Sequence, residues 1–228
     1  MKNVLIIDND IEFTELLTKF LQPDGFNVTS AYDGEMGIKK ALNQSAHVII
    51  IEITLPVKNG FEVLKAIREH LDTPILILTA RDTDIDKLVA LELGADDFLS
   101  KPCNPRELIA KLKAILKRVP KSPASRPVVE YHDLTVDGIK RQVSMKGIDL
   151  ELTNTEFNIL EMLIKSPGQA FSKEELTEYA MGRPYTAFDR SIDVHISNLR
   201  NKLGQNASGE LWLKTVRGYG YMFNSPTL

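Results

Sequence analysis

The sequence has little cysteine, little histidine and no long apolar segment. Its 228 residues include one cysteine, Cys103, and four histidines. A single cysteine excludes an internal disulfide and a cysteine-based metal site. No apolar run approaches the ~20 residues that span a bilayer, and the apolar segment before Asp8 is too short for the core of a signal peptide. We therefore expect a cytoplasmic protein without a membrane partner.

The composition, 43% hydrophobic and 26% charged, is that of a globular chain and excludes disorder over most of the length. A net charge of −3 speaks weakly against a wholly basic nucleic-acid binder. The charge is uneven, however, because residues 183–228 hold six basic and three acidic side chains. A basic end on an acidic protein is the pattern to test for DNA binding.

A segment with three prolines and two serines divides the chain at residues 119–127. It has no apolar periodicity, which is typical of a linker. We therefore predict one domain over residues 1–118 and a second over residues 128–228.

Short apolar runs alternate with helical patterns in the first half. The strands are expected at residues 4–7, 26–31, 48–51, 75–78 and 98–99. Each is followed by apolar residues at helical spacing. Five such units predict an α/β fold, a doubly wound five-stranded parallel sheet with helices on both faces.

The pattern changes after the linker. Residues 128–152 are expected to form short strands, and Thr153 with Glu156 and Ser172 with Glu175 have the spacing of capping boxes that open two helices. Pro167–Gly168 should end the first of these. A longer helix from about residue 188 to 203 precedes a hairpin. Three helices followed by a hairpin predict an α+β winged helix-turn-helix domain.

Polar side chains stand where the strands of the first half end. These residues are Asp8, Asn9, Asp10, Glu52, Thr79 and Lys101. Strand ends of a parallel sheet meet at one edge, so carboxylates, a hydroxyl and a lysine should converge there. That combination suits a small divalent cation and a phosphoryl group. The alternative is that these are solvated loop residues. This alternative is plausible for any one of them, but less so for all of them together, because they share one edge of the sheet.

The motifs of both halves resemble those of OmpR/PhoB-type response regulators, and within that family those of CpxR-like members. The first half resembles a receiver domain and the second the family's winged helix. The motifs that carry the resemblance are Ile7–Asp10, Glu52–Pro56 with Asn59–Gly60, Leu78–Arg81, Gly94–Phe98, Lys101–Pro102, Thr153–Phe157, Phe188–Arg200 and Thr215–Tyr221. The resemblance implies a two-component transcription regulator, not an enzyme.

Two positions depart from the family pattern. Glu52 stands where the family has the aspartate that accepts a phosphoryl group from a histidine kinase, and Asn9 replaces one of two adjacent acids. Mg²⁺ demands near-ideal octahedral geometry, so Asp8, Asn9 and Glu52 should form a weak or absent metal site, and no cofactor is required. Glu52 is expected to reach into the space of the phosphoryl group and to pair directly with Lys101.

The remaining pocket residues follow the family. Thr79 and Phe98 match its switch pair, with Lys101 beside them, so the output machinery should be present. We therefore expect regulation that does not depend on phosphorylation. Conventional phosphorelay signalling with weak phosphorylation remains an alternative.

The resemblance also implies a receiver dimer through the last two helices. Across a two-fold axis, Lys87 would meet Glu107, Glu92 would meet Lys113, Asp97 would meet Lys111, and Asp96 would meet Arg118. All eight residues carry the required sign. The alternative is an ordinary solvated surface, since single exposed pairs contribute only ~0–1 kcal/mol.

The periodicity of the last helix predicts a DNA-reading face opposite its apolar stripe. Its residues are Arg190, Val194, Ser197, Asn198 and Asn201, flanked by His195, Arg200 and Lys202. Val194 would meet a thymine methyl, and His195 is equally compatible with a half-buried structural role. Arg217 at the hairpin tip suits minor-groove insertion.

The leading hypothesis is therefore a regulator that binds direct-repeat half-sites of double-stranded DNA as a homodimer. RNA polymerase is an expected partner, and a histidine kinase a further one if phosphorylation persists. A phosphoryl-transfer enzyme is disfavoured because the chain has no P-loop. A signalling adaptor whose winged helix binds protein is disfavoured by the basic residues of the last helix and hairpin.

Overall fold

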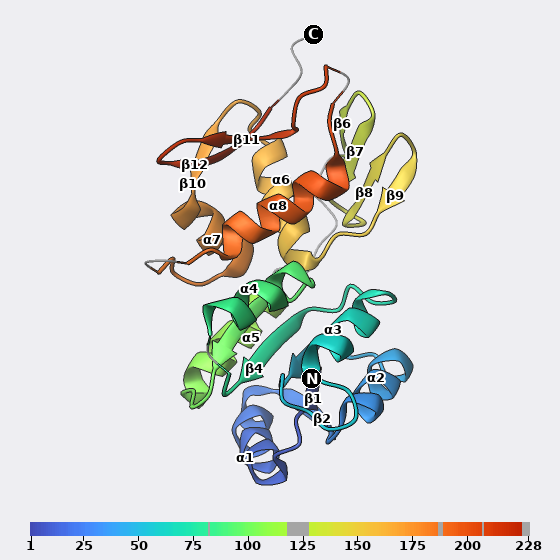
Figure 1. Ribbon diagram of the computed structural model, residues 1–228, viewed down its shortest axis with the longest axis vertical. Coiled ribbons are helices and arrows are strands. Elements are labelled where there is room, and N and C mark those ends of the chain that lie inside the picture. Colours follow the sequence, from blue (N-terminus) through green and yellow to red (C-terminus); the bar gives the residue numbers. More distant parts are fainter. Residues whose placement is uncertain (82, 118–127, 187–188, 207, 225–228) are drawn as a thin grey trace. The chain divides into compact units, whose positions relative to one another are not determined.

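The computed structural model describes residues 1–81, 83–117, 128–186, 189–206 and 208–224. The chain divides into two units, Met1–Arg118 and Val119–Leu228 (Figure 1). The predicted linker, residues 119–127, lies outside the described residues. Within the described parts of the chain, no helix is long and apolar enough to cross a membrane.

The first unit contains the predicted parallel sheet, with the strand order β2-β1-β3-β4-β5. Its strands are β1 (Lys2–Ile7), β2 (Phe26–Ala31), β3 (Val48–Ile51), β4 (Ile75–Thr79) and β5 (Asp97–Ser100). The helices are α1 (Ile11–Leu21), α2 (Gly34–Asn43), α3 (Gly60–Arg68), α4 (Asp84–Glu92) and α5 (Pro105–Lys117), with a short 3₁₀ turn, η1 (Gln22–Asp24), after α1. The doubly wound α/β fold predicted from the alternating pattern is confirmed.

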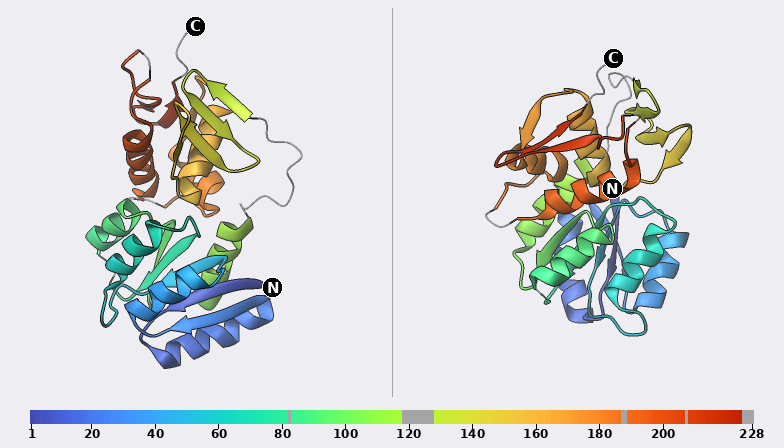
Figure 2. Two further views of the ribbon diagram at one scale, coloured as in Figure 1. Left: turned by 90° about the vertical axis from the view of Figure 1, so that its right-hand side faces the viewer. Right: turned by 45° about the horizontal axis from the view of Figure 1, so that its top comes forward.

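Alternate residues along each strand enter two separate cores. Val4 and Ile6 pack on the side of α1 and α5, whereas Leu5 and Ile7 pack on the side of α2, α3 and α4. Figure 2 shows helices on both faces of the sheet. Because both faces are covered, the central strand β3 is apolar at every position.

Side-chain caps fix where the receiver helices begin. Asn59 and Glu62 form a capping box at the start of α3, and Thr83 accepts a hydrogen bond from the Asp86 N–H at the start of α4. Such caps satisfy backbone donors that would otherwise lack a partner. They therefore position the loops that carry the polar residues of the sheet edge.

The second unit packs three helices against two small antiparallel sheets. The first sheet has the order β6 (Val128–Tyr131), β7 (Leu134–Asp137), β8 (Gln142–Met145) and β9 (Ile148–Leu150). The helices are α6 (Asn154–Ile164), α7 (Lys173–Met181) and α8 (Ser191–Leu203), and the hairpin consists of β11 (Leu213–Val216) and β12 (Gly220–Phe223). Both predicted capping boxes are present, and the winged helix-turn-helix prediction is confirmed.

Sequence reasoning missed one strand and extended one helix too far. β10 (Ala170–Ser172) pairs antiparallel with β12, which makes the hairpin a three-stranded sheet. Three residues are too few for an alternation of apolar and polar side chains to be recognised in the sequence, so this strand is defined only by its pairing with β12. The last helix begins at Ser191, whose backbone N–H donates to Asp189 Oδ1 at 2.9 Å. The residue at which this helix was predicted to begin, Phe188, lies outside the described residues.

Candidate functional site

The polar residues of the first unit meet at the carboxyl ends of its strands, as predicted. Asp8 follows β1, Glu52 follows β3, Thr79 ends β4 and Lys101 follows β5. We call this set the carboxylate pocket. Asp8 is 2% exposed and Glu52 is 6% exposed, so neither carboxylate is a solvated loop residue.

Lys101 joins the two carboxylates of the pocket. Its Nζ atom lies 2.6 Å from Asp8 Oδ2 and 2.8 Å from Glu52 Oε2. The other Glu52 oxygen, Oε1, accepts hydrogen bonds from the Thr79 hydroxyl and, at 3.1 Å, from the Thr54 N–H. The predicted direct pairing of Glu52 with Lys101 is confirmed. One glutamate therefore contacts both the lysine and the threonine of the pocket.

The pKa values in the pocket reflect burial and these contacts together. Burial raises the pKa of Asp8 above its ordinary value, against the opposing effect of Lys101 and of the Asp10 N–H. Burial alone would lower the pKa of Lys101, but hydrogen bonds and charge from Asp8 and Glu52 outweigh it and raise that pKa. Lys101 therefore remains a cation at neutral pH.

The donor set of the pocket fits Mg²⁺ poorly. Asp8 and Glu52 already hold the Lys101 ammonium, and the third predicted ligand, Asn9, is an exposed and uncharged residue. Among the described residues, no three acidic, histidine or cysteine side chains are grouped so as to hold a metal ion. The pocket therefore offers a divalent cation two carboxylates that already accept hydrogen bonds from Lys101, and no third charged ligand at Asn9.

The second predicted switch residue, Phe98, is half-buried and packs against the core on the side of α2, α3 and α4. The Lys87 Nζ lies 5.7 Å from the centre of its ring. Gly60, the first residue of α3, comes so close to the end of β3 that a Cβ there would lie 2.3 Å from the Glu52 carbonyl oxygen. The Asn59–Gly60 motif is thus explained by close packing beside Glu52.

Several residues of the predicted dimer face have partners within one chain. Asp96 is 2% exposed and lies 2.8 Å from the Arg68 guanidinium, and Asp97 pairs with Lys111 at 2.6 Å. Asp96 and Asp97 are therefore engaged with helices of their own receiver, and their proposed pairs with Arg118 and Lys111 of a second copy stay predictions.

The rest of the face is more open. Lys113 pairs with Asp24 at an exposed position. Glu92 and Glu107 are exposed, and Lys87 is half-buried. Arg118 lies outside the described residues.

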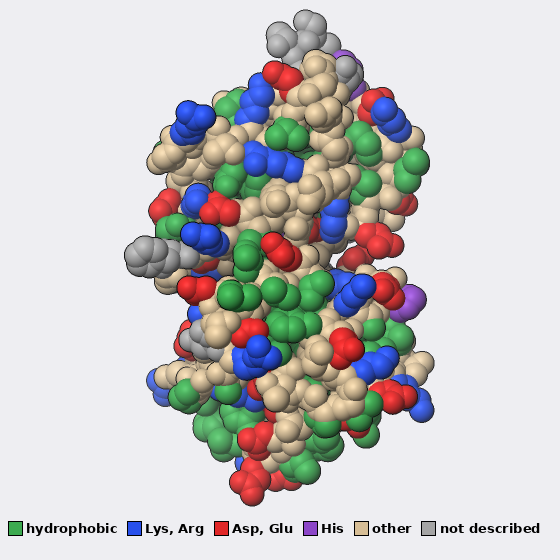
Figure 3. All heavy atoms as spheres, viewed as in Figure 1, with side chains coloured by type: hydrophobic (Ala, Val, Ile, Leu, Met, Phe, Trp, Pro, Cys, Tyr) green, Lys and Arg blue, Asp and Glu red, His purple; other side chains and the backbone are tan. Residues whose placement is uncertain are grey.

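The apolar stripe of α8 packs into the core as predicted, through Ile192, Ile196, Leu199 and Leu203. On the opposite side, Ser197 and Asn201 are exposed and Asn198 is half-buried, and Arg190 is exposed at the helix start. Figure 3 shows basic side chains on the face of this unit that carries α8 and the hairpin. The polar side of α8 is thus available to a ligand.

His195 does not lie on this polar side. It is fully buried, because it follows Ile192 by three residues and precedes Leu199 by four, and so shares their stripe. Its assignment to the DNA-reading face is wrong, and its structural alternative is favoured. Val194 is buried, at 6% exposure, but it does not belong to the hydrophobic cluster that the apolar stripe of α8 enters. Its contact with a thymine methyl stays a prediction.

The two flanking basic residues of α8 bind within the chain. The Lys202 Nζ lies 2.7 Å from the buried Glu156 carboxylate on α6. The Arg200 Nε donates to the Leu213 carbonyl at 2.9 Å and its Nη2 to the Thr215 hydroxyl at 2.8 Å. Both residues were predicted to flank the DNA-reading face, and here they hold α8 against α6 and the hairpin.

A polar network that the sequence reasoning missed orients α8 from its other side. Asp193 lies 2.8 Å from Lys173 Nζ, and it accepts a 2.6 Å hydrogen bond from the Tyr221 hydroxyl. Burial raises the pKa of Tyr221, and the hydrogen bond to Asp193 and the charge of that carboxylate raise it further. The Ser172 capping box marks where α7 begins, but it does not indicate that Lys173 contacts α8.

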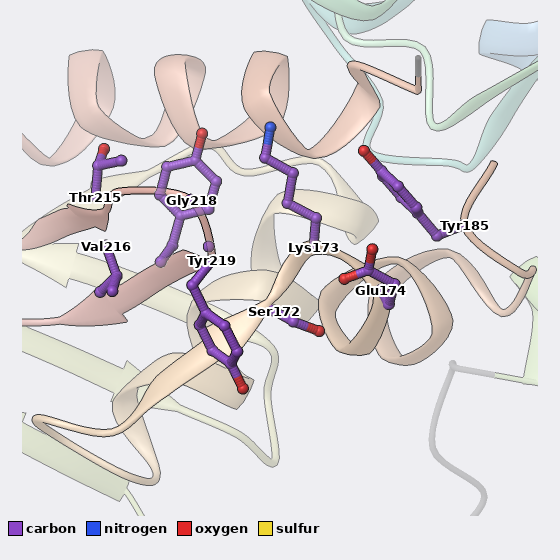
Figure 4. A pocket seen from close by; sticks show the side chains of 10 residues that line it. Ser172, Lys173, Glu174, Tyr185, Thr215, Val216, Gly218 and Tyr219 are labelled. Carbon is purple, nitrogen blue, oxygen red and sulfur yellow. The ribbon is translucent and has the colours of Figure 1, made fainter. Parts of the chain in front are cut away.

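A cavity of about 440 Å³ lies between the start of α7 and the hairpin, with Tyr185 and Tyr219 among its lining residues. Figure 4 shows Lys173 pointing across it toward α8. Arg217 stands exposed at the hairpin tip. There Gly218 has a φ of +74° and the Tyr219 N–H bonds the Val216 carbonyl at 3.0 Å. The predicted tip position of Arg217 is confirmed.

Comparisons with known proteins match each half of the chain separately. Residues 4–113 match the response regulator receiver domain, and residues 147–223 match the C-terminal domain of transcriptional regulatory proteins. The chain therefore belongs to the OmpR/PhoB family of two-component response regulators, which are DNA-binding transcriptional regulators and not enzymes.

Particular relatives cover nearly the whole chain. It is 42% identical to the transcriptional regulatory protein CpxR of Escherichia coli K12, over 99% of both chains. It is 45% identical to a CpxR homolog of Haemophilus influenzae, over 97% of this chain and 98% of that one. The solved structure of the response regulator DrrB, an OmpR/PhoB homolog of Thermotoga maritima, matches with a TM-score of 0.51 at 30% identity, covering 98% and 99% of the two chains.

Proposed function

We propose that this regulator binds direct-repeat DNA sites as a dimer and that its receiver takes its active arrangement without phosphoryl transfer. The observation that carries the proposal is the contact of Glu52 with both Lys101 and Thr79. The family resemblance implies that a phosphoryl group makes these same two contacts. Because a regulator of chromosomal genes acts where the chromosome lies, we place it in the cytoplasm, with RNA polymerase as a partner.

Phosphorylation of Glu52 itself is disfavoured by geometry. The Glu52 carboxylate is already engaged on both oxygens, and Asn9 contributes no charge to a metal site. Attack on a phosphodonor needs the carboxylate, the metal and the phosphorus aligned to within about an ångström, and misplacement of that size costs ~100-fold in rate. We therefore expect DNA binding that needs neither a phosphodonor nor Mg²⁺.

A conventional phosphorelay with weak phosphorylation is the second candidate. It is supported by the complete set of Thr79, Phe98 and Lys101, which a receiver without a signal has no need to keep. In that case a histidine kinase would be a partner. The two candidates differ in what a phosphodonor does to the unmodified protein.

The test replaces Glu52 by Gln, which keeps the side-chain length but removes the charge that pairs with Lys101. We expect Glu52→Gln to lower both self-association and affinity for a selected DNA site, measured by sedimentation and by fluorescence anisotropy. Unchanged values would mean that the receiver is inert. Glu69→Gln, at an exposed position at the end of α3, is the matched control and should leave both quantities unchanged.

A phosphodonor experiment separates the two candidates. With acetyl phosphate and Mg²⁺, phosphate-affinity electrophoresis should show no stable phosphoprotein. Glu52→Asp alone should restore little labelling, and Glu52→Asp with Asn9→Asp should restore more. Ready labelling of the unmodified protein at Glu52 would overturn the proposal in favour of the conventional phosphorelay.

A further inference from the structure

Lys101 has an aromatic neighbour that no sequence motif assigns to the carboxylate pocket. Its Nζ atom lies 4.3 Å from the centre of the Phe13 ring, in addition to its contacts with Asp8 and Glu52. The face of an aromatic ring attracts a cation at this distance, and more strongly where water is excluded. The Lys101 side chain is 15% exposed, so solvent screens the attraction only weakly.

One short loop positions both Asp8 and Phe13. The Asp10 backbone N–H donates to Asp8 Oδ1 at 3.0 Å, and the Asp10 side chain caps α1 by accepting from the Phe13 N–H at 2.9 Å. The Phe13 side chain also packs against the core that α1 and α5 form with the sheet. The ring is thus held by the helix cap and the core, independently of Lys101.

We infer that Phe13 is a positioning residue, whose ring holds the Lys101 ammonium against Asp8 and Glu52. Lys101 then bridges the two carboxylates, 2.6 Å from Asp8 Oδ2 and 2.8 Å from Glu52 Oε2. An ammonium group has three N–H donors, and two carboxylates and a ring face surround this one. The inference rests on the proposed function and deepens it, because it explains what holds Lys101 in contact with Glu52.

The test measures how readily the Lys101 amine leaves the pocket of the full-length protein. Each lysine is labelled with trace acetic anhydride at one pH, and the acetylation of Lys101 is read by mass spectrometry relative to that of the exposed Lys65. Phe13→Leu removes the ring but keeps an apolar side chain, and we expect it to raise the labelling of Lys101 roughly fivefold. Phe13→Tyr keeps the ring and should restore nearly the parental rate.

A matched control and a metal titration complete the design. Phe20→Leu removes an exposed ring two turns further along α1 and should not change the labelling of Lys101. Added Mg²⁺ should raise this labelling at lower concentrations in Phe13→Leu than in the parent, because the ion then competes with a less firmly held ammonium. If Phe13→Leu does not give the parental circular dichroism spectrum, Phe13→Met takes its place.

Equal labelling of Lys101 in the parent and the ring-free variant would overturn the inference. So would a Phe13→Tyr variant that is labelled as fast as Phe13→Leu, since the ring would then have no effect of its own. The proposed function fails in a different experiment. If Glu52→Gln leaves DNA affinity unchanged while Phe13→Leu exposes Lys101, Phe13 still positions Lys101 but the contact does not control output.

Discussion

Val57, in the loop between β3 and α3, has a backbone conformation that β-branched residues rarely adopt. Its φ is +70°, where the branched side chain crowds the backbone. At 74% exposure it gains little packing in return. The loop is kept in place by the Pro56 carbonyl, which accepts hydrogen bonds from the Gly34 and Lys58 N–H groups. Strain is therefore stored within a few residues of Glu52.

Replacing Val57 by Asn should raise the free energy of unfolding of the receiver by about 1 kcal/mol, because asparagine tolerates the left-handed region. Native-state hydrogen exchange of β3 and β4 amides in the full chain measures this for the receiver alone. Val57→Thr is the matched control, since it is polar but still β-branched, and should gain nothing. If both variants raised the free energy of unfolding equally, the gain would come from the loss of an exposed apolar side chain and not from relief of backbone strain.

At the scale of elements, α8 is held by contacts to all its neighbours in the second unit. Lys202 bonds α6, Asp193 bonds α7 and β12, and Arg200 bonds the hairpin. These charged side chains orient the helix, so they are less free to bind DNA. We therefore expect bases to be read by the polar side of α8, with Arg190, Ser197, Asn198 and Asn201, and the minor groove to be contacted by Arg217.

Arg217→Ala should weaken binding to a selected DNA site by ~1–3 kcal/mol, because a lone arginine at a hairpin tip suits a narrow minor groove. Lys214→Ala is the matched control on the same hairpin. Lys214 pairs with Glu210 at 3.0 Å, and its loss should change affinity much less. Fluorescence anisotropy at two salt concentrations measures both variants. Equal affinities for Arg217→Ala and the parent would remove the hairpin tip from the DNA-binding surface.

At the scale of the whole molecule, the predicted receiver dimer depends on fewer ion pairs than the sequence indicated. Asp96, Asp97 and Lys111 are engaged within their own receiver. The predicted pair of Lys87 with Glu107 would join α4 to α5 of a second copy, and α4 also carries the exposed apolar residues Ile85 and Leu88. A two-fold axis makes every remaining pair occur twice.

Charge reversal tests this face. Glu107→Lys should weaken self-association, and adding Lys87→Glu should restore part of it, since like charges across an interface oppose association. Sedimentation equilibrium measures the dimerisation constant of each variant. Glu35→Lys on α2, at another exposed position, makes the same change in net charge and should have little effect. If the single and double variants dimerised as the parent does, the α4–α5 face would not be the interface.

The sequence by itself determined the two folds and the edge of the sheet where the polar residues meet. Hydrophobic periodicity is a local property, so β2 and β3 were predicted with the bounds that the structure shows. The convergence of Asp8, Glu52, Thr79 and Lys101 followed from parallel strand direction alone. The pairing of Glu52 with Lys101 was also predictable, since one added methylene moves a carboxylate toward a known neighbour.

Only the tertiary structure decided which partner each long charged side chain takes. Asp96 pairs with Arg68, which is 28 residues away in the sequence, and Lys202 pairs with Glu156, which is 46 residues away. Phe13 lies close to Lys101 because α1 and α5 pack on the same face of the sheet. These contacts join residues far apart in the chain, so periodicity and spacing, which report on near neighbours, contain no signal for them.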